Sequence, residues 1–247
     1  MYTAFASVYD RLMADVDYTA WAAFYRELLR LGGVETGAVC ECACGTGSLT
    51  IPLFKTYDMT GADLSADMLA VAQDKARQKG LSIPFVLMDM RKLTLHRPQD
   101  AVLCTCDGVN YLESEQDVSA FFAAAHRALK PHGTLVFDLS TPYKLKTILG
   151  NRTHGEDEKD IAYLWINRFD EKRCRVQMRL VIFKRGQDGR YSRITEEQTQ
   201  YGYTLGRLEA LLEAAGFTDI RAYGDKTLSA PGADETRWHI AARKKVR

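Results

Sequence analysis

Apolar and polar residues alternate along the chain in patterns that predict a regular succession of helices and strands. In YTAWAAFYRELLRL, residues 18–31, apolar side chains recur every three or four positions, as on one face of an amphipathic helix. Beyond it, short apolar runs predict strands at 38–43, 59–63, 83–89, 101–107 and 134–139, separated by amphipathic segments that predict helices at 48–55, 66–78 and 117–129. This alternation indicates a parallel sheet covered by helices on both faces.

The pattern changes after residue 141. The polar segment NRTHGEDEKD, residues 151–160, predicts a loop. Three stretches then alternate with period two, at 161–169, 174–183 and 191–203, and they predict antiparallel strands, the last two joined by a turn at Asp188-Gly189. A helix at 205–217 and strands at 219–225 and 237–245 follow.

The expected fold is therefore α/β, with a doubly wound, mostly parallel seven-stranded sheet and an inserted three-stranded antiparallel sheet. We expect residues 1–145 and 204–247 to form the α/β domain. Residues 146–203 would form an inserted β subdomain that covers a substrate or makes an oligomer contact. The pattern leaves open whether the protein is a monomer or a homodimer.

Charge and cysteine content narrow the possible functions. The chain has 33 Lys and Arg against 32 Asp and Glu, so no overall field attracts nucleic acid or an anionic membrane. It has no apolar run of the ~20 residues that a membrane helix needs, and no apolar run of signal-peptide length at the N-terminus. Six cysteines without a secretory signal indicate free thiols in a reducing compartment, which predicts a cytoplasmic location.

The run VCECACGTG, residues 39–47, allows three interpretations: a metal site, a redox site or a backbone turn for a nucleotide. Cysteines at every second position of a strand are spread too far along the chain to close a tetrahedral metal site easily, and the Cys-x-x-Cys spacing of a redox dithiol is absent. We therefore expect no metal and interpret the cysteines as buried packing beneath the sheet. Gly45 and Gly47 remain, where the first strand turns into a helix whose N–H groups can face a ligand.

Acidic residues follow at the ends of the next strands. Asp63 stands twenty residues after Ala43, where a carboxylate can accept both hydroxyls of a ribose. Asp89 ends the third strand and Asp107 the fourth. Three acids at successive strand ends beside a glycine loop indicate a nucleoside pocket. A dinucleotide dehydrogenase fits less well, because the third glycine of its Gly-x-Gly-x-x-Gly fingerprint is missing.

The ordered series VCECACGTG, GADLS, LMDM, CTCDGVNYL and LKPHGTLVFDL resembles the motifs of class I S-adenosylmethionine-dependent methyltransferases, over roughly residues 35–140 and the last two strands. The segment FASVYDRLM resembles a subgroup with small-molecule substrates and inserted strands, which includes glycine and sugar-amine N-methyltransferases. In one departure, Ala43 replaces the first glycine of the family's Gly-x-Gly-x-Gly loop and crowds the cofactor's amino-acid end.

The resemblance implies S-adenosyl-L-methionine as cofactor and methyl transfer to N or O of a small molecule. Two other functions stay open, an RNA- or protein-directed methyltransferase and a nucleotide-binding oxidoreductase or non-catalytic protein on the same fold. No catalytic residue is predicted, because a neutral amine or an anion needs no base to attack a sulfonium methyl. Asn110 and Tyr111 are the implied substrate-binding residues. The implied cofactor-binding residues are Tyr9, Glu41, Ala43, Gly45, Gly47, Asp63, Leu64, Met68, Asp89, Met90 and Asp107.

Overall fold

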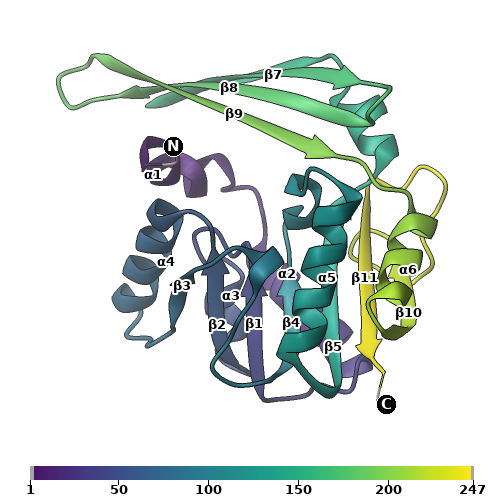
Figure 1. Ribbon diagram of the computed structural model, residues 1–247. Coiled ribbons are helices and arrows are strands. Elements are labelled where there is room, and N and C mark those ends of the chain that lie inside the picture. The colour runs from purple at the N-terminus through teal and green to yellow at the C-terminus, as the bar shows by residue number, and fades with distance from the viewer. Residues whose placement is uncertain (1–2, 246–247) are drawn as a thin grey trace.

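The computed structural model describes residues 3–245, which form two sheets (Figure 1). The larger sheet has seven strands in the order β10-β11-β5-β4-β1-β2-β3. Strands β5, β4, β1, β2 and β3 pair in parallel, whereas β11 is antiparallel to both of its neighbours, so the predicted mostly parallel sheet is confirmed. The bounds are β1 Ala38–Cys42, β2 Asp58–Asp63, β3 Phe85–Leu87, β4 Gln99–Cys104, β5 Leu129–Ser140, β10 Phe217–Tyr223 and β11 Arg237–Lys244.

The helices begin where short polar side chains can accept the free N–H groups of a first turn. Asp17 caps α2 and Ser65 caps α4, as each accepts a backbone N–H of the helix that follows it. The helix predicted at 48–55 is only the four residues of α3, whose start has no side-chain cap. The bounds are α1 Thr3–Leu12, α2 Tyr18–Leu31, α3 Thr50–Leu53, α4 Ala66–Gln78, α5 Glu115–Ala128 and α6 Leu205–Ala214, with short helices η1 Met90–Lys92, η2 Gly108–Tyr111 and η3 Lys144–Leu149.

The inserted sheet has four strands, not the three that the sequence predicts. Its order is β6-β7-β8-β9, with β6 Thr153–Glu158, β7 Ile161–Asp170, β8 Arg175–Arg185 and β9 Tyr191–Tyr201. The segment expected to be a loop contains β6, whose six residues are all exposed. Main-chain pairing with β7 makes it a strand, and an edge strand that buries neither face carries no hydrophobic alternation for a sequence pattern to detect.

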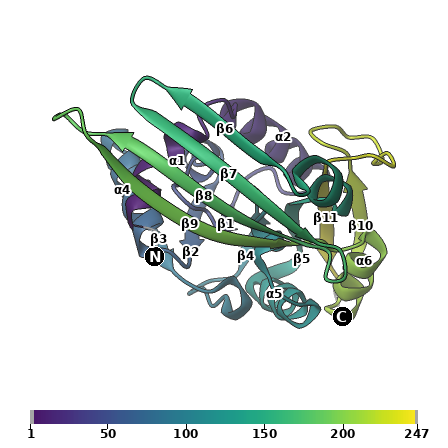
Figure 2. The same cartoon turned by 90° about the horizontal axis from the view of Figure 1, so that it is seen from above.

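The inserted sheet lies over the carboxyl ends of the parallel strands, and α1 lies beneath it (Figures 1 and 2). Phe5 and Val8 of α1 pack with Met68 of α4 below and with Ile161 and Ile182 of the inserted sheet above. The N-terminal helix is thus held between the two sheets, next to the strand ends. Within residues 3–245, no helix has the length and apolar character to cross a membrane.

Three of the cysteines are packing residues of the larger sheet. Cys40, Cys42 and Cys104 are fully buried in the core that this sheet forms with α5 and α6. Cys106 differs from these three cysteines, because it lies beyond the end of its strand. Strand β4 ends at Cys104, and Cys106 adopts a left-handed backbone conformation, with φ 55°, that turns its thiol toward the strand ends.

Candidate functional site

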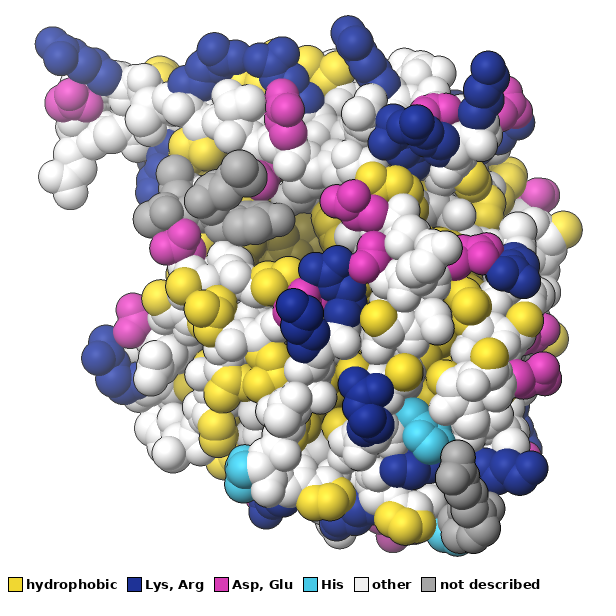
Figure 3. Space-filling view, viewed as in Figure 1, with side chains coloured by type: hydrophobic (Ala, Val, Ile, Leu, Met, Phe, Trp, Pro, Cys, Tyr) yellow, Lys and Arg dark blue, Asp and Glu magenta, His cyan; other side chains and the backbone are white. Residues whose placement is uncertain are grey.

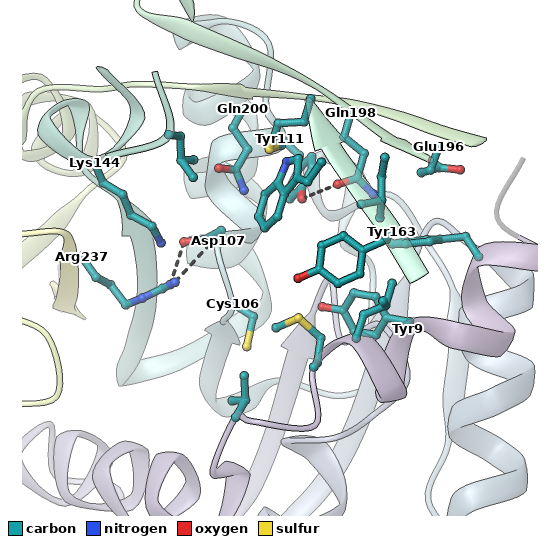
Figure 4. Close-up of a pocket in the computed structure, with 18 of the residues that line it drawn as sticks. Tyr9, Cys106, Asp107, Tyr111, Lys144, Tyr163, Glu196, Gln198, Gln200 and Arg237 are labelled. Carbon is teal, nitrogen blue, oxygen red and sulfur yellow. Dashed lines mark hydrogen bonds and ion pairs between the residues drawn. The ribbon is translucent and has the colours of Figure 1, made fainter. Parts of the chain in front are cut away.

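Two cavities meet where the parallel strands end. The loop cavity, of about 210 Å³, lies against the turn after β1 and the end of β2. The roof cavity, of about 230 Å³, lies between the strand ends and strands β7–β9 (Figure 4). The residues that line both cavities form what we call the junction, and they are Phe5, Tyr9, Cys106, Tyr111 and Gln198.

The turn after β1 has the left-handed conformations that glycine favours. Gly45 has φ 53° and lines the loop cavity, and a Cβ atom built on it would meet no atom within 4 Å. Gly47 has φ 70° and plays a different part, because a Cβ there would lie 3.1 Å from Ala72 and Phe85. Gly45 thus leaves space on the cavity side, whereas Gly47 lets the turn pack against α4 and β3.

Ala43 lines the loop cavity with φ 52°, so this alanine holds a conformation that costs a non-glycine residue about 1 kcal/mol. We expect Ala43→Gly to raise the free energy of unfolding by up to that amount, measured by urea denaturation. Ala62→Gly, at a buried position of β2, is the matched control and should lower it, because a strand glycine is destabilising. A loss of stability in Ala43→Gly would mean that the methyl contact near Gly108 outweighs the backbone strain.

The carboxylate of Asp63 is fixed against the loop. It accepts the N–H of Gly45 at 2.8 Å on one oxygen and the N–H of Ser65 at 2.8 Å on the other. Burial raises the pKa of Asp63, and these backbone hydrogen bonds oppose the rise. Asp63 lines the loop cavity, and each carboxylate oxygen can accept a further hydrogen bond from a ligand.

Glu41 lies at the base of the loop cavity and is 1% exposed. The hydroxyl of Thr105 donates to it at 2.6 Å, and the hydroxyl of Thr50 donates to its other oxygen. Burial raises the pKa of Glu41 to about 7, although these two hydrogen bonds favour the ionised form. A cationic group of a ligand in the loop cavity would favour the ionised form of this carboxylate.

The walls of the loop cavity are apolar, and Leu64, Met68, Met88 and Met90 line them. Asp89, expected beside them, is outside the set of lining residues. Its carboxylate is held by the guanidinium of Arg91 at 2.7 Å, and it also accepts the N–H of Arg91 at 2.9 Å. Asp89 therefore caps η1, while its neighbour Met90 lines the cavity.

Helix α1 is tied to the glycine turn by a polar cluster that sequence reasoning missed. Asp10 accepts the hydroxyl of Thr46 at 2.6 Å and pairs with Lys75 of α4 at 2.7 Å, and Ser48 donates to the same carboxylate at 3.3 Å. The motif FASVYDRLM contains Asp10, but its partners lie 36 to 65 residues away. The preceding residue, Tyr9, is thereby held in the junction.

Asp107 lines the roof cavity and not the loop cavity. Arg237 of β11 binds its carboxylate through both terminal nitrogens, at 2.6 and 3.1 Å, and also pairs with the fully buried Asp138. Asp138 accepts the N–H groups of Cys106 and Asp107, both left-handed residues, at 2.9 and 2.8 Å. Burial raises the pKa of Asp107, but the charges of Arg237 and Lys144 outweigh it and hold this pKa below its usual value. Asp138 and Arg237 thus fix the turn that carries Asp107.

The two predicted substrate residues have different environments. Asn110 is fully buried and lies outside both cavities, where its side chain binds both main-chain groups of Ser140 and the carbonyl of Tyr201 at 2.8 to 3.0 Å. It ties η2 to β5 and to the end of β9. Tyr111 lies in the junction, and its hydroxyl donates to Gln198 of β9 at 2.9 Å (Figure 4).

Comparison with known proteins identifies the family. Residues 39–133 match the family described as methyltransferase domain. A protein of Geobacillus sp. (strain WCH70) assigned as a methyltransferase is 34% identical over 245 residues, which are 98% of this chain and 99% of the relative. The chain belongs to the class I S-adenosylmethionine-dependent methyltransferases.

Two further methyltransferases match this chain over most of its length. The solved structure of an S-adenosylmethionine-dependent methyltransferase from Clostridium acetobutylicum has a TM-score of 0.90 and 29% identity, and the match covers 99% of both chains. A glycine/sarcosine N-methyltransferase of Halorhodospira halochloris is 28% identical over 91% of this chain and 80% of the relative. S-adenosylmethionine is the cofactor of this enzyme.

The loop cavity fits that cofactor. Gly45 leaves open space above the turn, the carboxylates of Glu41 and Asp63 face the cavity, and Met68 and Met90 provide apolar surface for a base. A nucleoside with a cationic amino-acid tail needs these three kinds of surface together. Bound S-adenosylmethionine supplies a methyl group on a cationic sulfur, which is a strong leaving group.

Proposed function

We propose that the enzyme transfers the methyl group of S-adenosylmethionine to an N or O atom of a small molecule in the roof cavity. The observation that carries the proposal is the junction, where the two cavities meet through five shared residues. In-line displacement requires the acceptor atom to lie opposite the sulfur on the axis of the breaking bond. Two cavities that meet at one point favour that alignment.

Within the loop cavity, we assign Asp63 to the ribose hydroxyls and Glu41 with the turn at 43–47 to the methionine moiety. Leu64, Met68 and Met90 would contact the adenine. The enclosure of the site supports a small acceptor, because the inserted sheet covers the roof cavity and α1 covers the junction (Figures 1 and 2). On the face seen in Figure 3, Lys and Arg side chains are interspersed with acidic ones, which is unlike the continuous basic stripe typical of nucleic-acid binding.

The junction is suited to alignment and to the exclusion of water. Burial, followed by the effect of Cys106, raises the pKa of Tyr9 well above its usual value, so its phenol stays neutral at physiological pH. Tyr9 can therefore orient an acceptor through hydrogen bonds, but it does not serve as a ready base. The acceptor would attack as a neutral amine or as an oxygen anion.

The first test is thermal unfolding with S-adenosylmethionine, S-adenosylhomocysteine or NAD in large excess. A ligand that binds only the folded state stabilises it by about 2.7 kcal/mol at a hundred times its dissociation constant. We expect the melting temperature to rise with both sulfur nucleosides and to stay constant with NAD. No rise with either sulfur nucleoside would refute the proposed function.

Replacing Asp63 with Ala tests the assignment to the ribose. We expect a loss of about 2 kcal/mol in binding free energy for S-adenosylmethionine, roughly 30-fold in affinity, because charge-assisted hydrogen bonds disappear. Calorimetric titration measures the loss. Asp58→Ala is the control, since Asp58 begins the same strand and is exposed at its other end. An unchanged affinity in Asp63→Ala would remove this residue from the site.

A further inference from the structure

Lys144 lines the roof cavity with a cationic side chain that has no directly bonded partner within residues 3–245. It is the first residue of η3, a single π-helical turn that forms part of the cavity wall. Its backbone N–H donates to the hydroxyl of Thr141 at 3.1 Å, which fixes the start of the turn. Among residues 3–245, no side chain makes a hydrogen bond or ion pair with its ammonium group. This cation is therefore available to a ligand.

The second cation of the roof cavity is already paired. The guanidinium of Arg237 is engaged by Asp107 and Asp138, and it lies 5.1 Å from the ring of Trp21. Asp107 in turn makes its ion pair with Arg237. Lys144 and Arg237 both extend toward Asp107 in Figure 4, but only Arg237 pairs with it. The two cations balance Asp107 and Asp138 in number, but among residues 3–245 the ammonium of Lys144 makes no direct contact with either carboxylate and can bind a further anionic group.

An ammonium group in an enclosed site gains from a directly bonded anionic partner. Lys144 is partly buried, and this burial lowers its pKa against the opposing effect of Asp107. The cavity is lined by apolar residues such as Leu149 and Trp165 and also by acceptors such as Asp107, but no described side chain makes a direct hydrogen bond to this ammonium group. A lysine serving only as a solvated surface charge would not be expected there.

Resting on the proposed function, we propose that the methyl acceptor carries an anionic oxygen group, a carboxylate or a phosphate, that binds the ammonium of Lys144. Figure 4 shows Lys144 on the side of the roof cavity opposite Tyr9 and Glu196. An acceptor held by its anionic group at Lys144 would extend across the cavity toward Tyr9 and the junction. Lys144 would thus select the acceptor and set its direction, without contact with the transferred methyl group.

The test uses the full-length enzyme saturated with S-adenosylhomocysteine, with sodium phosphate or sodium acetate at 100 mM as the probe and sodium chloride of equal ionic strength as the baseline. For a dissociation constant of roughly 20 mM, the anion raises the melting temperature by about 2–4 °C. We expect this rise in the wild type and its loss in Lys144→Met. A shift with phosphate alone indicates a phosphorylated acceptor, and a shift with acetate alone indicates a carboxylate.

The control variant is Lys146→Met, two residues along η3, where the lysine is exposed and pairs with Glu171. Lys146→Met should retain the rise in melting temperature with the anion. If Lys144→Met does not fold, Lys144→Gln takes its place and should lose this rise. Phosphate stabilises many proteins by exclusion from their surface, so only the difference between variants counts. Equal shifts in wild type and Lys144→Met, or no shift in either, would overturn the proposal. A melting temperature that does not respond to S-adenosylhomocysteine would refute the proposed function instead.

Discussion

Replacing Arg237 with Met is expected to lower the free energy of unfolding by about 3–5 kcal/mol. The guanidinium pairs with both Asp107 and Asp138, whose side chains are 17% and 0% exposed, and methionine would leave both buried carboxylates without their directly bonded cation. The loss should appear in urea denaturation as a lower midpoint with an unchanged slope. Because Asp138 also holds the turn at Cys106, the roof cavity should lose its shape along with the stability.

The control for this substitution is Arg221→Met, at an exposed position of the neighbouring strand β10, which should change stability by less than about 0.5 kcal/mol. The double variant Arg237→Met with Asp138→Asn removes one of the stranded charges and should recover part of the loss. If Arg237→Met were as stable as the wild type, the three side chains would not form a coupled buried cluster.

A second large effect is expected from pH, through Glu41. Its pKa is about 7 in the folded protein, against 4.5 for an unperturbed glutamate. Below pH 4.5 the group is protonated in both states, and its contribution to stability is fully present. As pH rises through 7, the folded state must ionise a buried carboxyl that the unfolded state ionises earlier. The free energy of unfolding should fall by about 3 kcal/mol over this range.

The measurement is the difference in unfolding free energy between the wild type and Glu41→Gln at a series of pH values, since the other titrating groups cancel. Glu35→Gln, at an exposed position before β1, should give no such pH dependence. A flat difference between pH 5 and 8 would mean that Thr50 and Thr105 keep Glu41 ionised throughout. Bound S-adenosylmethionine should reduce the slope, because its cationic groups favour the carboxylate.

The larger sheet and the loop cavity could be predicted because their determinants are local. Gly45 and Gly47 sit in one turn, and the acids follow strands whose apolar runs are visible in the sequence. Strand β6 could not be predicted, because only pairing with β7 defines it. The sequence assigned Asn110 to the substrate and did not indicate that its side chain is buried between β5 and β9. That burial depends on hydrogen bonds to residues 30 and 91 positions away in the chain.

Two residues of the roof cavity could not be identified from sequence patterns, for a related reason. Arg237 meets Asp107 across 130 residues, and a lone arginine in a C-terminal strand gives no sign of that partner. Lys144 is distinguished by what it lacks, namely an acceptor among the described residues, and a sequence does not show the absence of a partner. In each case the role depends on where the inserted sheet and the last strand lie relative to the strand ends.

The position of β11 in the sheet has a consequence for how the protein is made. This strand lies between β5 and β10 although it follows both of them in the chain, so the sheet is completed from within by a segment that is synthesised after its two neighbours. Until that strand is made, β5 has a free edge. Asp107 and Asp138 also lack their partner Arg237, which lies about a hundred or more residues later in the chain. Long sequence separation slows folding. A nascent chain interrupted before residue 237 would expose that edge, which makes late synthesis the stage most prone to aggregation.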